Sequence, residues 1–359
     1  MKAFMTRLLF AALLAIVVAG CARKEPAMVF PAEEWERWES VKKAGYDLKA
    51  IPDILSFVED SMNTSALMVT VYGKVMLEYG DIEQISYLAS VRKSILSMLY
   101  GIYVDNGTIN LDLTLEDLGM DDIGGLLPIE KQAKVRHLIA ARSGVFHPAS
   151  NSGDDLASAP ERGSVEPGTY QLYSNWDFNA AGGAFELMTG KNIYDAVEEH
   201  LAIPLQMQEW DRSIHRKSGN LRVSQYPAYH INLSTRDMAR IGHLMLNMGN
   251  WNGNRIIPEA WVVESTSKIT PLEAMNPPRR RSGYLAYGYM WWIYAGEKSD
   301  GPWKGAYTGR GAVGQWITVV PELGMVIAHK TVPGTGGSTE WPEYDKLLTM
   351  IFNAKKGKS

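Results

Sequence analysis

The stretch Ser90-Val91-Arg92-Lys93 places a hydroxyl and a primary amine three residues apart, at the start of an apolar segment with helical spacing. That spacing predicts a helix over 90–105, ended by Asn106-Gly107. Residues three apart share one helix face, so the amine can reach the hydroxyl. A helix N-terminus favours a developing anion, and a desolvated lysine can accept the serine proton. The stretch predicts an activated serine, although the same spacing also occurs by chance in helices whose Ser and Lys face solvent.

The segments around this helix predict the fold class. Strand-forming residues gather near both ends of the chain, and helical patterns lie between them and at the C-terminal end. We therefore expect an α+β fold with one antiparallel sheet built from both chain ends, flanked by helices, and with a mainly helical region inserted. The expected strands are 66–71, 75–79, 287–294, 315–320 and 325–329, and the further expected helices are 177–189, 235–248 and 343–353.

The same patterns suggest how the chain is divided. We expect a signal peptide over 1–20 and a lipidated linker with an N-terminal segment over 21–45. Residues 46–89 and 235–355 should form the sheet region, and 90–234 the helical region. Together these parts are expected to make one catalytic unit.

The N-terminus has the pattern of a targeting segment. Lys2 and Arg7 precede an apolar stretch that is too short to span a bilayer. Val18-Ala19-Gly20-Cys21 resembles a bacterial lipobox, which implies cleavage before Cys21 and lipid attachment to it. The alternative is an ordinary signal peptide with an incidental cysteine. The resemblance implies an exported lipoprotein that faces the periplasm, anchored to the membrane only through its lipid. Because Ala22 rather than Asp follows the cysteine, the outer membrane is the expected location in a host that has one.

Composition excludes several classes of protein. The 359 residues carry a net charge of −4, and 46% are hydrophobic, which excludes disorder along the whole length. A slightly acidic chain also lacks the basic surface that nucleic-acid binding requires. The one basic run, Arg279-Arg280-Arg281, is interpreted as a solvated loop. With one Cys there can be no internal disulfide, and the seven His show no metal-ligand spacing.

Two further motifs support a catalytic role for the serine. Tyr173-Ser174-Asn175 lies about 80 residues downstream, and Gly309-Arg310-Gly311-Ala312-Val313-Gly314-Gln315 leads into a strand near the C-terminus. The order of the three motifs resembles the serine β-lactamase, penicillin-binding protein and esterase superfamily, from about residue 66 to 352. The branch that it resembles in particular is class C-like and includes aminohexanoate-oligomer hydrolases and esterases. The stretches that carry this likeness are Ser90-Val91-Arg92-Lys93-Ser94, Ala141-Arg142-Ser143-Gly144-Val145-Phe146-His147-Pro148 and Asn175-Trp176-Asp177-Phe178-Asn179.

The resemblance implies a β-lactamase/transpeptidase-like fold and a role for each matching residue. Ser90 would be the acylated nucleophile, and Lys93 would be its base or would lower the pKa of a partner. Tyr173 would carry the proton to the leaving group and then help to activate water. Asn175 would bind Lys93 or the substrate. The Ser90 N–H and one N–H of the third-motif strand would form the oxyanion hole, and no cofactor or metal would be needed.

The third motif departs from the family pattern. Gly311 aligns with the motif's glycine and Ala312 with the oxyanion donor; the alternative register is Tyr307-Thr308-Gly309, with Arg310 as donor. In either register the cation that would bind a β-lactam carboxylate is missing from its usual place, and Arg310 is the candidate substitute. This departure favours a neutral ester or amide as substrate.

Three functions therefore stay open. The first is a serine hydrolase acting on a small ester or amide through an acyl-enzyme on Ser90. The second is a β-lactamase or D-alanyl-D-alanine peptidase, and the third is a lipoprotein that binds a cell-wall ligand without catalysis. The sequence does not indicate the oligomeric state.

Overall fold

The structure is a computed structural model that describes residues 26–356. The predicted signal peptide and Cys21 lie outside the described residues. Within that part, no helix is both long and apolar enough to cross a membrane. The helices are α1 (Ile51–Ser61), α2 (Val91–Asp105), α3 (Val135–Ile139), α4 (Asn175–Thr189), α5 (Ile193–Val197), α6 (Thr235–Leu246), α7 (Glu259–Ser265) and α8 (Trp341–Asn353).

The main sheet is antiparallel throughout, in the order β2-β1-β13-β12-β11-β10-β9. Its strands are β1 (Ala66–Val71), β2 (Lys74–Gly80), β9 (Leu285–Tyr287), β10 (Trp292–Tyr294), β11 (Tyr307–Gly311), β12 (Gln315–Val320) and β13 (Met325–Lys330). Two of them come from the N-terminal part of the chain and five from the C-terminal part, which confirms the expected α+β architecture. Short strand pairs elsewhere involve β3 (Ser86–Tyr87), β4 (Lys217–Ser218), β5 (Ala228–Tyr229), β6 (Asn232–Leu233), β7 (Asn250–Trp251) and β8 (Asn254–Arg255).

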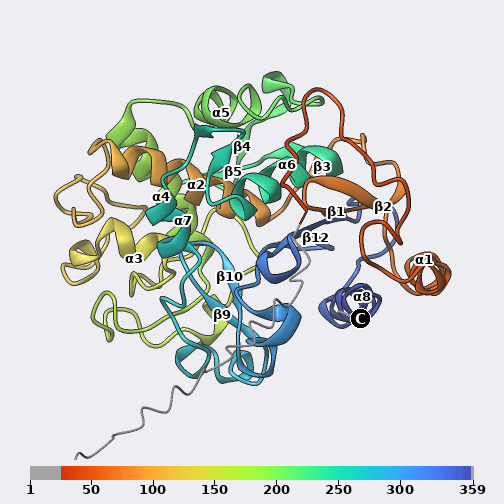
Figure 1. Ribbon diagram of the computed structural model, residues 1–359. Coiled ribbons are helices and arrows are strands. Elements are labelled where there is room, and N and C mark those ends of the chain that lie inside the picture. The colour runs from red at the N-terminus through yellow and green to blue at the C-terminus, as the bar shows by residue number, and fades with distance from the viewer. Residues whose placement is uncertain (1–25, 357–359) are drawn as a thin grey trace, which may run out of the picture.

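Successive strand residues point to opposite faces of the sheet, and helices cover both faces. Trp316 of β12 stacks on Tyr344 of α8 with ring centroids 4.0 Å apart, so α8 covers one face, with α1 beside it (Figure 1). Helix α6 covers the other face. A Cβ atom built on Gly242 would lie 2.4 Å from Val326 Cγ1, so a glycine at this position allows α6 to pack closely against β13.

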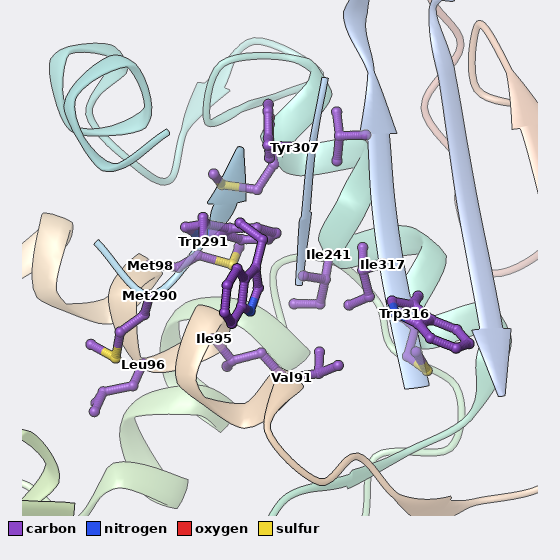
Figure 2. Close-up of a cluster of buried hydrophobic side chains, with 14 of the residues drawn as sticks. Val91, Ile95, Leu96, Met98, Ile241, Met290, Trp291, Tyr307, Trp316 and Ile317 are labelled. Carbon is purple, nitrogen blue, oxygen red and sulfur yellow. The ribbon is translucent and has the colours of Figure 1, made fainter. Parts of the chain in front are cut away.

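Helix α2 runs through the interior and carries the predicted nucleophile to the edge of the core. Val91 and Ile95 of α2 lie in one buried cluster with Trp291 and with Ile317 of β12, and Ile95 is next to the Trp291 ring (Figure 2). On another side of the helix, Tyr100 OH donates a 2.7 Å hydrogen bond to the Ala181 carbonyl of α4. Packing on both sides fixes the helix, and with it the position of its first turn.

One predicted element is wrong, and the others agree within two residues at their ends. The strand expected over 287–294 is two strands, β9 and β10, joined by a tight turn in which Tyr287 pairs with Trp292. Some of the aromatic residues that suggested one long strand lie in this turn. Met290 has φ 61°, and a Cβ built on Gly288 would lie 2.2 Å from the Ser265 carbonyl oxygen. Close packing against the end of α7 therefore bends the chain here.

Candidate active site

Four of the predicted site residues meet around one buried amine. Lys93 Nζ lies 2.9 Å from Ser90 Oγ, 2.6 Å from Tyr173 OH and 2.7 Å from Asn175 Oδ1. These residues come from the start of α2, from the segment before α4 and from the first residue of α4. The hydroxyl, the amine and the phenol thus form a continuous chain of hydrogen-bonding groups along which a proton can move.

Local structure explains how the serine is presented. Ser90 is the N-cap residue of α2 and does not use its side chain to cap the helix, which leaves the hydroxyl free to contact Lys93. Ala89, directly before it, has φ 48°. A left-handed conformation costs a non-glycine residue roughly 1–2 kcal/mol. Such strain at a site is maintained only where the surrounding structure imposes it, here at the entry to the helix.

The contacts of Asn175 and Tyr173 fix their orientation. Asn175 Nδ2 donates to the Ser152 carbonyl at 2.8 Å, and its backbone N–H donates to Asp154 Oδ2 at 3.0 Å. These bonds direct Oδ1 towards Lys93 Nζ. The Tyr173 ring is stacked on Trp292 with centroids 5.4 Å apart, so the phenol oxygen is held beside the amine. Both residues therefore enter the site in one defined geometry.

Burial shifts the pKa values of the amine and the phenol in opposite directions, because it favours the neutral form of each group. Desolvation lowers the pKa of Lys93 well below its usual value, and the charge of Arg92 lowers it further, while the charge of Asp154 opposes the shift. Desolvation raises the pKa of Tyr173, although a hydrogen bond from Ser90 and nearby arginines partly oppose this. A neutral amine can accept a proton from Ser90, whereas the phenol keeps its own proton at neutral pH.

The third motif approaches the nucleophile through Gly311. A Cβ atom built on Gly311 would lie 2.4 Å from the Leu88 carbonyl oxygen and 3.1 Å from Ser90 N, so a glycine is required for β11 to come this close. Gly309 lies instead against the side chain of Ser94. Of the two registers left open by the sequence, the one with Gly311 and Ala312 therefore puts the strand end beside the Ser90 backbone.

A pocket of about 180 Å³ opens over the serine. Five of the predicted residues line it, namely Ser90, Tyr173, Arg310, Gly311 and Ala312. Lys93 is buried behind this wall, 2% exposed, where it contacts Ser90 and Tyr173.

The interpretation of residues 279–281 as a solvated loop holds for the exposed Arg279 and Arg281 but not for Arg280, whose side chain is 25% exposed and which the sequence analysis missed as a site residue. Asp155, which is 4% exposed, accepts a hydrogen bond from Arg279 Nη2 and one from Arg280 Nε, each 2.6 Å long. Arg280 then lines the pocket, with its guanidinium 5.7 Å from the centre of the Tyr173 ring. No sequence signal could have shown this, because the anchoring carboxylate lies 125 residues away.

Comparison with known proteins identifies the family of the chain. The family model described as Beta-lactamase matches residues 57–331. The chain belongs to the beta-lactamase family. It is 23% identical to the 6-aminohexanoate-dimer hydrolase of Paenarthrobacter ureafaciens over 91% of this chain and 83% of that protein.

Several solved structures share the fold. A penicillin-binding protein homologue from Caulobacter crescentus matches with a TM-score of 0.61 at 13% identity, over 85% of this chain and 97% of that one. A family VIII carboxylesterase matches with a TM-score of 0.60 at 14% identity, over the same shares of the two chains. At these identities the likeness establishes the fold alone, and the chemistry is inferred from the arrangement of residues around Ser90.

Proposed function

We propose that this serine hydrolase acts on a small ester or amide through an acyl-enzyme on Ser90. The observation that carries the proposal is the position of Lys93 Nζ, within hydrogen-bonding distance of both Ser90 Oγ and Tyr173 OH. The carboxylesterase and the aminohexanoate-dimer hydrolase among the similar proteins support the substrate class.

In the first half of the reaction, Ser90 Oγ attacks the substrate carbonyl carbon and its proton passes to Lys93 Nζ. We assign the base to Lys93 because burial lowers its pKa, whereas burial raises that of Tyr173. The proton then moves through Tyr173 OH to the leaving oxygen or nitrogen as the carbonyl–leaving-group bond breaks. The backbone N–H groups of Ser90 and Ala312 are the proposed donors to the oxyanion.

In the second half, water replaces the leaving group. Tyr173 and Lys93 accept a proton from the water as its oxygen bonds to the acyl carbon, and the bond from Ser90 Oγ to that carbon breaks. The proton returns to Ser90, the carboxylic acid leaves, and the enzyme is restored. Asn175 keeps Lys93 in place in both halves through its 2.7 Å contact.

A substrate panel tests the proposed class. Short-chain aryl esters, aminohexanoate oligomers, nitrocefin and D-amino peptides are compared with wild-type protein and with a Ser90→Ala control. We expect turnover of esters or amides that the Ser90→Ala variant lacks. Nitrocefin as the best substrate would instead favour the β-lactamase alternative, and saturable binding without turnover of any compound would favour a binding protein.

We further propose that the protein is exported and lipid-anchored through Cys21, facing the periplasm. The lipobox-like stretch Val18-Ala19-Gly20-Cys21 and the presence of only one Cys in the chain support this location. Cells that express the full chain and are fed an alkyne-labelled palmitate should label the wild-type protein but not the Cys21→Ser variant. The share of the protein recovered in the membrane fraction should also be lower for Cys21→Ser. Ser90→Ala is the matched control, which keeps its lipid. Membrane recovery of Cys21→Ser at the wild-type level would contradict the anchor.

A further inference from the structure

Arg310 carries a charge into the pocket that the protein does not neutralise directly. Its guanidinium lies between two aromatic rings, 5.3 Å from the centre of Trp341 and 6.0 Å from that of Trp292. Within residues 26–356, the Arg310 side chain makes no hydrogen bond and no ion pair within 4.0 Å. Glu340 also lines the pocket, but its carboxylate caps α8. The negative charge of Glu340 acts on Arg310 only from beyond ion-pair distance, and a largely desolvated cation with no anion in contact favours a ligand that brings a negative charge to it.

Arg280 brings a second charge to the same pocket from a different segment. Its guanidinium lies 5.3 Å from the centre of the Trp292 ring, the ring that Arg310 also contacts. Asp155 holds Arg280, but this one carboxylate is shared with Arg279, so two cations face one anion. The charges of Arg280 and Arg310 repel each other across the pocket.

We propose that Arg280 and Arg310 together bind a carboxylate of the substrate, so that the preferred substrates are small esters or amides that carry a negative charge. Guanidinium groups form strong, charge-assisted hydrogen bonds with carboxylates, and a shared anion would relieve their mutual repulsion. The proposal rests on the proposed function and replaces the neutral substrate that the third motif predicts.

Matched pairs of substrates test this preference. One pair is an aryl monoester of adipic acid and the same ester with its free carboxylate converted to the carboxamide. The other pair has the carboxylate or carboxamide on the phenol, as para-carboxyphenyl hexanoate and its amide. Because a hydrogen bond to a charged group contributes about 1.5–3 kcal/mol, we expect kcat/KM to favour the carboxylate about tenfold or more in at least one pair.

Variants then assign the preference to the two arginines. Arg310→Gln and Arg280→Gln should each lower the carboxylate-to-carboxamide ratio about tenfold, chiefly through KM, and Arg310→Lys should retain part of it because the charge remains. Arg279→Gln is the matched control: it removes the neighbouring arginine from the same carboxylate, yet Arg279 does not line the pocket among the described residues, so the ratio should persist. Raising the ionic strength should lower the wild-type ratio.

The outcomes separate this inference from the proposed function. A wild-type ratio near one in both pairs, or a ratio that Arg310→Gln and Arg280→Gln leave unchanged, would overturn the carboxylate site even if both carboxamides are hydrolysed. No Ser90-dependent hydrolysis of any of the four substrates would instead contradict the proposed function. Should Arg280→Gln fail to fold because Asp155 loses a partner, Arg310→Gln decides, since its guanidinium makes no hydrogen bond with another described residue.

Discussion

Replacing Ser90 with alanine is expected to abolish covalent labelling by a fluorophosphonate probe and to lower kcat by roughly 10³-fold or more. The physical reason is that Ser90 Oγ is the hydroxyl beside the buried Lys93 amine and lines the pocket. Without it, no acyl-enzyme can form, and only binding and the oxyanion donors remain. Intact mass spectrometry after probe treatment, together with ester hydrolysis, measures both effects.

The matched control for this variant lies on the same helix. Ser97 is buried in α2, and its hydroxyl has no hydrogen-bond partner among the described residues. Ser97→Ala should therefore keep both the labelling and the activity of the wild type. Labelling of Ser90→Ala at the wild-type level would show that another nucleophile reacts, and the acyl-enzyme assignment to Ser90 would then be wrong.

Replacing Lys93 with methionine should lower kcat/KM by about 10²–10⁴-fold, the usual contribution of a general base. It should also remove a pH dependence. In the wild type the amine accepts the serine proton only when it is neutral, so activity should fall as the pH falls through the lowered pKa of Lys93. A pH profile of kcat/KM for the two proteins measures this, and the acid limb should be absent from Lys93→Met.

Another buried group could contribute to an acid limb by destabilising the protein. Desolvation lowers the pKa of Lys330 to about 7, so the folded state loses stability as the pH falls from the usual pKa of lysine towards 7. Lys330→Met is therefore the matched control, a second buried lysine that should leave the acid limb in place. Circular dichroism across the same pH range shows whether each protein stays folded. A wild-type profile that is flat from acid to neutral pH would contradict the role of Lys93, though not that of Ser90.

Local patterns predicted much of the fold because they depend on neighbours in the sequence. Gly190 ends α4 in a left-handed conformation, as expected from a residue without a side chain. Ser234 Oγ accepts the Asp237 N–H at the start of α6, as the capping pattern predicts. The strand expected over 287–294 failed because its turn depends on contact with Ser265, which the local sequence does not contain.

By itself, the sequence determined that a hydroxyl and an amine would share the first turn of a helix, since helical geometry alone brings Ser90 and Lys93 together. The resemblance of three motifs to a family added Tyr173 and Asn175 to that group. Only the tertiary structure decided that Gly311 meets the Ser90 backbone and that Arg280 turns into the pocket. Those contacts join segments far apart in the chain, and they arise from the packing of β11 and from a carboxylate, Asp155, on a distant loop.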